Sequence, residues 1–137
     1  LQQGKYKEAV AELQAVLRQR PKDPGVLNNL AWALGELKDP RAREYAEAAF
    51  GLDNQDPAIL DTLGWLLTQG GQVARGVEML ERAVSLDPSV PQIRYHLAQA
   101  YQQSGNLNGA RRELERLVAD PRFAAKAEAK KRLAELL

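Results

Sequence analysis

The sequence contains no cysteine and little of the other chemistry on which catalytic and metal sites depend. Its 137 residues include no cysteine, one methionine and one histidine, His96. Disulfides, thiolate zinc sites and cysteine nucleophiles are therefore excluded, although the lack of cysteine does not identify a compartment. We expect no cofactor, no metal site and no catalytic residue.

Excess charge and long apolar runs are also missing. Nineteen basic residues against eighteen acidic ones give a formal net charge of +1, which argues against a nucleic-acid partner. No apolar run approaches the roughly 20 residues of a membrane helix, so we do not expect the chain to span a membrane. Basic residues are frequent after residue 110, a pattern typical of a solvated helix face, with an acidic partner as the alternative.

The beginning of the chain lacks an initiator methionine, a signal peptide and a lipid-attachment cysteine. Leu1 to Gly4 reads as the end of a helix whose body is missing. We therefore expect a piece of a longer protein, and the missing targeting segment says nothing about that parent.

The stretch from Pro57 to Pro88 contains one complete structural unit. Two segments with apolar residues three and four apart, 59–67 and 73–86, flank Gly70-Gly71. This spacing predicts two amphipathic helices joined by a turn. Gly64 and Gly76 fall on their facing sides, which favours a closely packed hairpin.

The same unit recurs before and after this stretch. Pro24, Pro57 and Pro91 lie 33 and 34 residues apart, and a series of leucines and small residues keeps these steps. A repeat of this length predicts one all-α domain of stacked hairpins. We expect seven α-helices and no strands. The predicted divisions are 5–20 (second helix of a truncated repeat), 24–52, 57–86 and 91–119 (repeats), and 121–137 (a capping helix).

The unit resembles the tetratricopeptide repeat. The matching positions are Leu60, Leu63-Gly64, Leu67, Gly76, Leu80 and Pro88. Departures are Gly76 where alanine is usual, Ala46 where a large apolar residue is usual, and a one-residue deletion near Lys38-Asp39-Pro40. The resemblance implies an α-solenoid of helix-turn-helix hairpins wound as a right-handed superhelix.

Five stretches carry a narrower resemblance: NNLAWAL, DPRAREYAEAAFGLD, PAILDTLGWLL, ARGVEMLERAVSLDP and PQIRYHLAQAY. They are similar to the C-terminal repeats of bacterial tetratricopeptide lipoproteins associated with exosortase and exopolysaccharide (PEP-CTERM) systems. This implies a scaffold in the cell envelope, periplasmic or anchored to the outer membrane.

A candidate ligand-binding groove follows from the first helix of each repeat, because these helices line the concave side of such a solenoid. The predicted groove residues share one helix face and are Asn28, Trp32, Asp61, Trp65, Thr68, Tyr95, Gln99 and Gln102. Trp32 and Trp65 hold the same repeat position, so we expect them side by side. Aromatic residues are enriched at binding hot spots. The alternative is that the tryptophans only fill the seam between helices.

His96 is the one candidate general base, since Asp61 and Thr62 lie about one repeat away. A nucleophile and a phosphate-binding loop are both lacking, so we expect a hydrogen-bonding role and not an enzyme. Some tetratricopeptide domains grip C-terminal carboxylates with clustered lysine and arginine. The groove positions here offer none, which excludes such a clamp.

The sequence thus predicts a non-catalytic scaffold that binds a protein or peptide along the concave groove. Two alternatives stay open: a structural spacer within a longer solenoid, and a polysaccharide-binding module. We also expect possible self-association, because the helix with Tyr6, Val10, Leu13 and Leu17 lacks its partner and leaves an apolar edge.

Overall fold

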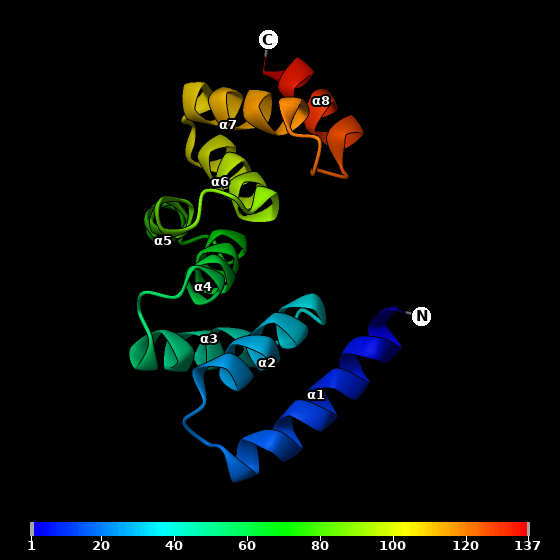
Figure 1. The fold of residues 1–137 in the computed structure, drawn as a ribbon, viewed down its shortest axis with the longest axis vertical. Coiled ribbons are helices and arrows are strands. Elements are labelled where there is room, and N and C mark those ends of the chain that lie inside the picture. The colour runs from blue at the N-terminus through cyan, green and yellow to red at the C-terminus, as the bar shows by residue number, and fades with distance from the viewer. Residues whose placement is uncertain (1, 137) are drawn as a thin grey trace.

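The computed structural model describes residues 2–136, which form eight α-helices and no strand (Figure 1). The helices are α1 (Gln2–Gln19), α2 (Pro24–Glu36), α3 (Arg41–Leu52), α4 (Pro57–Gln69), α5 (Val73–Leu86), α6 (Pro91–Ser104), α7 (Leu107–Ala119) and α8 (Lys126–Glu135). Helices α2 and α3, α4 and α5, and α6 and α7 pack as three successive hairpins, with α1 against α2 and α8 against α7. The predicted all-α solenoid is confirmed.

The first helix of each hairpin begins at a proline. Pro24, Pro57 and Pro91 occupy the first helical turn, where the missing N–H costs no hydrogen bond. Two of these helices are also capped by an aspartate. Asp23 accepts from the backbone N–H groups of residues 25 and 26, and Asp56 from that of residue 58 at 2.8 Å. Proline and aspartate therefore fix where α2 and α4 start.

The three hairpin turns share one geometry. Each has a residue in the left-handed region one or two positions after the first helix, and the next N–H donates to a carbonyl five residues back, as in a Schellman motif. The left-handed residues are Lys38 (φ 56°), Gly71 (φ 91°) and Gly105 (φ 87°). The three hydrogen bonds run from Asp39 to Leu34, from Gln72 to Leu67 and from Asn106 to Tyr101, each 2.9 Å. The first repeat alone makes this turn without glycine.

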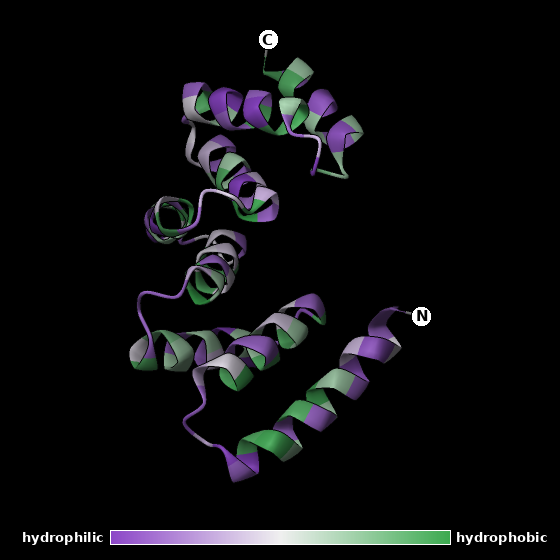
Figure 2. Cartoon of the chain, viewed as in Figure 1, coloured by the Kyte–Doolittle hydropathy of each residue, from purple (hydrophilic) through white to green (hydrophobic). Residues whose placement is uncertain are grey.

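Helix α4 is the centre of the stack, because it packs against α5 and also touches α2, α3 and α6. Its contact with α5 is closest at Gly64 and Gly76, where an added Cβ would lie within 3.0 Å of the facing helix. The contacts of α4 with α2 and α6 place the three first helices along one side. Figure 1 shows the N-terminus at the free end of α1 and the C-terminus beyond α8, at the opposite end of the stack, and Figure 2 shows polar and apolar residues on every helix.

Three details of the predicted layout were wrong. The structure has eight helices and not seven, since three hairpins and two single helices already make eight. Residues 2–4 belong to α1, because that helix continues through Gly4 without a turn. The final helix begins at Lys126 and not at residue 121, since residues 120–125 form a turn in which Asp120 accepts from Arg122. Leu1 and Leu137 lie outside the described residues.

The apolar edge expected on α1 is mostly covered. Val10 is 9% exposed, and Tyr6, Leu13 and Leu17 are partly buried against Leu30, Ala33, Leu34 and Ala42. The large apolar side chain that α1 does expose is Val16, at 40%. The four residues named for self-association therefore pack within the chain itself.

Candidate functional site

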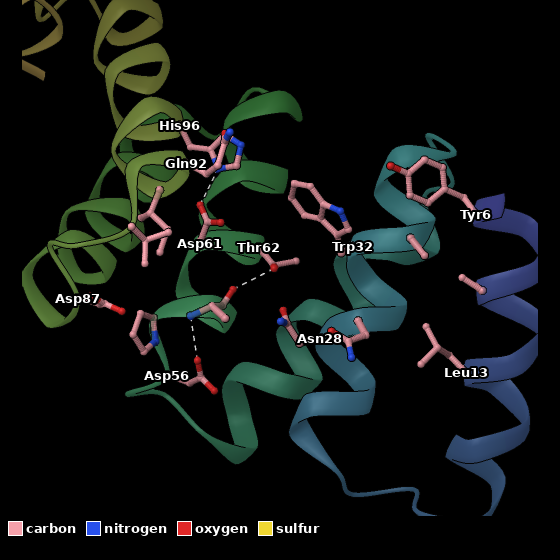
Figure 3. Close-up of a pocket in the computed structure, with 17 residues that line it drawn as sticks. Tyr6, Leu13, Asn28, Trp32, Asp56, Asp61, Thr62, Asp87, Gln92 and His96 are labelled. Atoms are coloured by element: carbon pink, nitrogen blue, oxygen red, sulfur yellow. Dashed lines mark hydrogen bonds and ion pairs between the residues drawn. The ribbon is translucent and has the colours of Figure 1, made fainter. Parts of the chain in front are cut away.

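A cavity of about 740 Å³ opens on the concave side, between α1 and α2 on one wall and α4 and α6 on the other (Figure 3). Apolar and amide side chains make up most of its lining. The lining residues are Tyr6, Ala9, Leu13, Asn28, Asn29, Trp32, Ala33, Asp56, Pro57, Ala58, Asp61, Thr62, Asp87, Val90, Gln92, Ile93 and His96. A cavity of this size and character is typical of a ligand site.

Three of the eight predicted groove residues line this cavity: Asn28, Trp32 and Asp61. Asn28 and Trp32 lie four residues apart on α2 and therefore share one of its faces. Asp61 holds on α4 the repeat position that Asn28 holds on α2. Figure 3 shows the three side chains pointing into the space between the helices.

The two tryptophans are joined through His96. The imidazole of His96 stacks on Trp65 with ring centroids 4.5 Å apart and planes 18° apart, and lies 6.0 Å from the ring of Trp32. Its Nδ1 lies 2.7 Å from Asp61 Oδ1, and both side chains are mostly buried. The hydrogen bond expected of His96 is thus formed between α6 and α4, and it orients both the histidine and the carboxylate.

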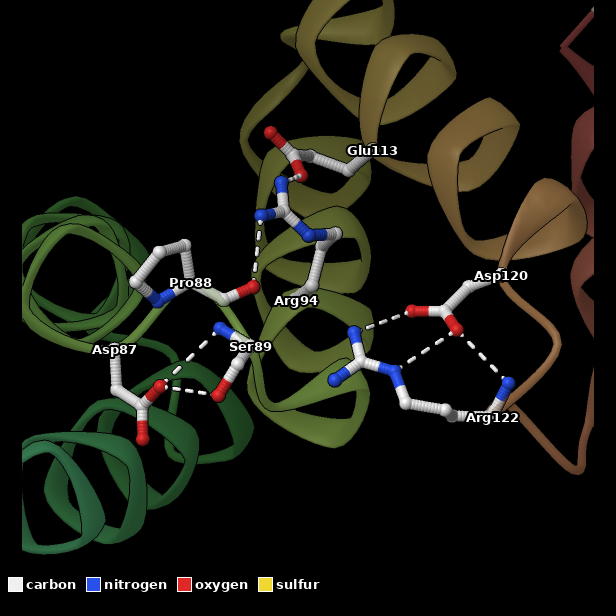
Figure 4. A network of polar contacts seen from close by, with 7 residues as sticks. All are labelled: Asp87, Pro88, Ser89, Arg94, Glu113, Asp120 and Arg122. Atoms are coloured by element: carbon white, nitrogen blue, oxygen red, sulfur yellow. Dashed lines mark hydrogen bonds and ion pairs between the residues drawn. The ribbon is translucent and has the colours of Figure 1, made fainter.

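The charged side chains of the cavity are aspartates. Asp56, Asp61 and Asp87 line it, and none of its lining residues is lysine or arginine. In each aspartate Oδ1 accepts a hydrogen bond within the protein, while Oδ2 has no partner among the described residues. Hydrogen bonds from the Ser89 side chain and backbone lower the pKa of Asp87, so this carboxylate is charged at neutral pH (Figure 4).

Thr68, predicted as a groove residue, lies in the core. It is 1% exposed, and its hydroxyl donates to the carbonyl oxygen of Gly64 at 2.8 Å. The prediction was wrong because Thr68 follows Gly64 by four residues and so shares the face of α4 that meets α5.

Tyr95 and Gln102 lie on the predicted face, but the last helix covers them. The Tyr95 ring packs edge-on against Phe123 with centroids 5.3 Å apart, and its hydroxyl accepts from Arg132 Nε at 3.0 Å. Arg132 Nη1 donates to Gln102 Oε1 at 3.4 Å. Gln99 is half-buried and, like Trp65, does not line the cavity. The open part of the groove is therefore shorter than predicted.

Sequence reasoning missed the cavity residues that come from α1 and from the ends of helices. Tyr6 and Leu13 were assigned to an exposed edge, and Asp56 was not among the predicted groove residues. Asp87 follows the last residue of α5 and enters the cavity rim in the turn before α6. The repeated aspartate-proline pairs could have revealed the two aspartates. They place one carboxylate at the start of α4 and another at the start of the turn that leads into α6.

The site offers little for catalysis. His96 and Asp61 form a histidine–carboxylate pair, but the hydroxyl of neighbouring Thr62 donates to the Ala58 carbonyl oxygen at 3.0 Å. Within residues 2–136 no three histidine, aspartate or glutamate side chains gather as metal ligands do. Over the same residues, every helix is too short or too polar to cross a bilayer.

Two comparisons concern the sequence. Residues 67–133 match a family described as tetratricopeptide repeat, and residues 1–38 match one described as TPR repeat. Protein FlbA of Caulobacter vibrioides is 29% identical over 103 residues, which are 74% of this chain. The chain spans 17% of the length of that relative.

Solved structures share the fold. A structure of MamA from Desulfovibrio magneticus RS-1 has a TM-score of 0.74 at 22% identity, covering 97% of this chain and 86% of that one. YrrB, described as a TPR protein with an unusual peptide-binding site, has a TM-score of 0.76 at 22% identity, covering 93% and 67%. The Naa15/Naa10 complex bound to HypK-THB gives 0.69 at 20% identity, covering 96% and 20%.

Proposed function

Because this chain is built of tetratricopeptide repeats, we propose that it is a non-catalytic scaffold that binds a peptide segment of a partner protein in its concave cavity. The observation that carries this proposal is the cavity itself, of about 740 Å³, with a tryptophan and several amides on its walls. YrrB, a solved protein of the same fold, is described as having a peptide-binding site. At 22% identity YrrB shares the fold, and the cavity of this chain supports the proposal.

The apolar and the amide side chains of the lining have complementary tasks in this proposal. Trp32 supplies a large apolar surface, and Tyr6 and Leu13 face it from α1 (Figure 3). Aromatic side chains give much contact area at a low cost in conformational entropy. Asn28 and Gln92 carry amides that can donate to and accept from an extended backbone.

Two other functions remain as alternatives. A structural spacer would leave the cavity empty and use the tryptophans only for packing, as the stacking of Trp65 on His96 illustrates. A polysaccharide ligand would stack its sugar rings on Trp32 and pair its hydroxyls with the amides. The peptide is favoured because Trp32 faces apolar residues of α1, and a sugar would leave these poorly covered.

The cellular setting is a separate proposal. The stretches that resemble exosortase-associated and exopolysaccharide-associated lipoproteins favour a role in the bacterial envelope, with a lipid anchor on the parent protein. The relatives described above do not bear on this setting. Fractionation of cells that express the parent protein, followed by detection in the outer-membrane or periplasmic fraction, tests it. Detection only in the cytoplasmic fraction would contradict it.

Affinity capture with a Trp32→Ala variant tests the scaffold function. We expect the wild type to retain a partner protein directly, and Trp32→Ala to bind it more weakly by about 2 kcal/mol, the size of a hot-spot effect. Phe50→Ala is the control, since Phe50 is an aromatic residue outside the cavity lining, partly buried near Arg82. Protease treatment of the extract should abolish capture, and glycosidase treatment should not.

Some outcomes would support the alternatives. Capture that survives protease but not glycosidase would favour a polysaccharide ligand. Equal capture by the wild type and a folded Trp32→Ala/Trp65→Ala variant would show that the groove is not the binding surface and would favour the spacer.

A further inference from the structure

The charges of the cavity restrict which peptides it can hold. Three aspartates line it, and each keeps an Oδ2 atom without a partner among the described residues. No lysine or arginine belongs to the lining. An acidic segment would be repelled there, whereas a cationic side chain would gain charge-assisted hydrogen bonds.

Aromatic groups lie beside these carboxylates. Trp32 and Asp61 line the same cavity, and His96 contacts both of them. A guanidinium or ammonium group over the face of an indole is attracted by the ring quadrupole. The site therefore combines two independent features that favour a cation: carboxylate acceptors and an aromatic face.

The chain itself places an arginine on the continuation of this groove. Arg132 of α8 donates to the Tyr95 hydroxyl at 3.0 Å, and its guanidinium carbon lies 5.8 Å from the centroid of the Tyr95 ring. Tyr95 follows Asp61 by 34 residues and holds the same repeat position on α6 that Asp61 holds on α4. The covered half of the groove thus contains an arginine, and the open half carries a carboxylate, that of Asp61, at the matching position.

Asn28 contributes a side-chain amide to the wall of the cavity. Its Oδ1 is buried and accepts no hydrogen bond among the described residues. A buried polar atom without a partner is rare and costly in a folded protein. Asn28 holds the same repeat position as Asp61 and Tyr95, and rotation of its side chain toward the cavity would let a donor from a bound segment satisfy this oxygen.

We propose that the cavity binds a basic peptide segment, in which an arginine or lysine lies among Asp56, Asp61 and Asp87 and neighbouring apolar residues pack on Trp32 and α1. This proposal rests on the proposed peptide-binding function and specifies its ligand. The partner is a protein with an exposed segment of alternating basic and apolar character.

Selection from a displayed library of random peptides, each about twelve residues long, tests the class of ligand directly. We expect the selected peptides to be enriched in arginine or lysine next to apolar residues. A selected peptide is then synthesised with its basic residues, and again with glutamine in their place, and titrated calorimetrically. The glutamine peptide should bind at least about tenfold more weakly.

The matching protein variant is Asp56→Asn/Asp61→Asn/Asp87→Asn. Asparagine keeps the side-chain oxygen that caps α4, so the fold should be retained. We expect this variant to bind the basic peptide at least about tenfold more weakly and the glutamine peptide as the wild type does. The control is Glu36→Gln/Glu78→Gln/Glu115→Gln, which changes net charge equally at exposed positions outside the cavity and should bind within about twofold of the wild type.

The outcomes separate this proposal from the function on which it rests. The selected peptides could lack basic residues and still bind the wild type more tightly than Trp32→Ala. That result would overturn the basic-peptide proposal and leave the scaffold function standing. A library that yields no peptide sensitive to Trp32→Ala would overturn both. Equal losses in the cavity variant and the surface control would show a general charge effect and also overturn the proposal.

Discussion

Replacement of Gly76 by alanine tests the packing argument at the closest contact of the stack. A Cβ added at Gly76 would lie 2.3 Å from Thr68 Oγ1 and 2.8 Å from the carbonyl oxygen of Gly64. Both distances are too short for non-bonded contact, so α4 and α5 must separate. Overpacking of this kind costs about 1–3 kcal/mol.

Two further effects modify this value. Alanine is a better helix former than glycine by about 1 kcal/mol, which partly offsets the cost. The added methyl group also displaces the Thr68 hydroxyl, which disturbs its hydrogen bond to Gly64 within α4, worth about 1 kcal/mol. These terms nearly cancel, and we expect Gly76→Ala to lower the free energy of unfolding by about 1–3 kcal/mol.

Urea unfolding followed by far-ultraviolet circular dichroism measures this change. The matched control is Gly51→Ala in α3, because a Cβ there meets no atom within 4 Å. The control should be stabilised by about 0.5 kcal/mol through helix propensity alone. If Gly76→Ala unfolds at the same urea concentration as the control or at a higher one, the close contact between α4 and α5 does not exist as described.

A second substitution identifies the cause. Thr68→Ala removes the hydroxyl nearest to the added methyl group and leaves the Gly64 carbonyl oxygen in place. Gly76→Ala/Thr68→Ala should therefore lose less stability than the two single changes summed, with a coupling energy of about 1 kcal/mol. Simple additivity would contradict a direct clash between the two residues.

Three further predictions concern other parts of the fold. Lys38→Gly should stabilise the protein by about 0.5–1 kcal/mol, because Lys38 has a left-handed backbone that glycine adopts without strain. Urea unfolding measures this change, and a lower midpoint than that of the wild type would contradict it. A hydrogen bond from Arg75 lowers the pKa of Glu47 in the folded state. This partly exposed ion pair stabilises the fold by less than about 1 kcal/mol. The stabilisation is complete above the ordinary glutamate pKa and disappears as pH falls through the lowered pKa. The stability difference between wild type and Glu47→Gln should accordingly vanish in acid, and a constant difference would exclude the ion pair as its source. Phe123→Ala should lower the free energy of unfolding by about 3–5 kcal/mol and release α8 from Tyr95. Hydrogen exchange should then show lower protection of residues 126–135, and unchanged protection would refute this packing.

The sequence predicts the helices well because local signals and the repeat agree. Proline and aspartate mark where α2 and α4 begin, and glycine marks the turns at Gly71 and Gly105. The apolar period then selects the buried leucines. Such signals act over a few residues, so they can be seen without knowing what lies across the stack.

The groove is predicted less well because its composition depends on contacts between distant segments. Asn28, Trp32 and Asp61 follow from their shared repeat position. The loss of Tyr95 to the interior depends on how α8 turns back after residue 120, and no repeat pattern describes that turn. Thr68 could have been excluded from the sequence, because its spacing from Gly64 already places it on the face toward α5.

The cluster of His96 with the two tryptophans gives the protein an optical signal beside the proposed binding cavity. The chain has two tryptophans and one histidine, and all three meet in one cluster beside the cavity. Tryptophan emission from the whole molecule therefore reports on this cluster alone. A segment that excludes water from Trp32 should shift the emission to shorter wavelength, which allows occupancy of the cavity to be followed without any label.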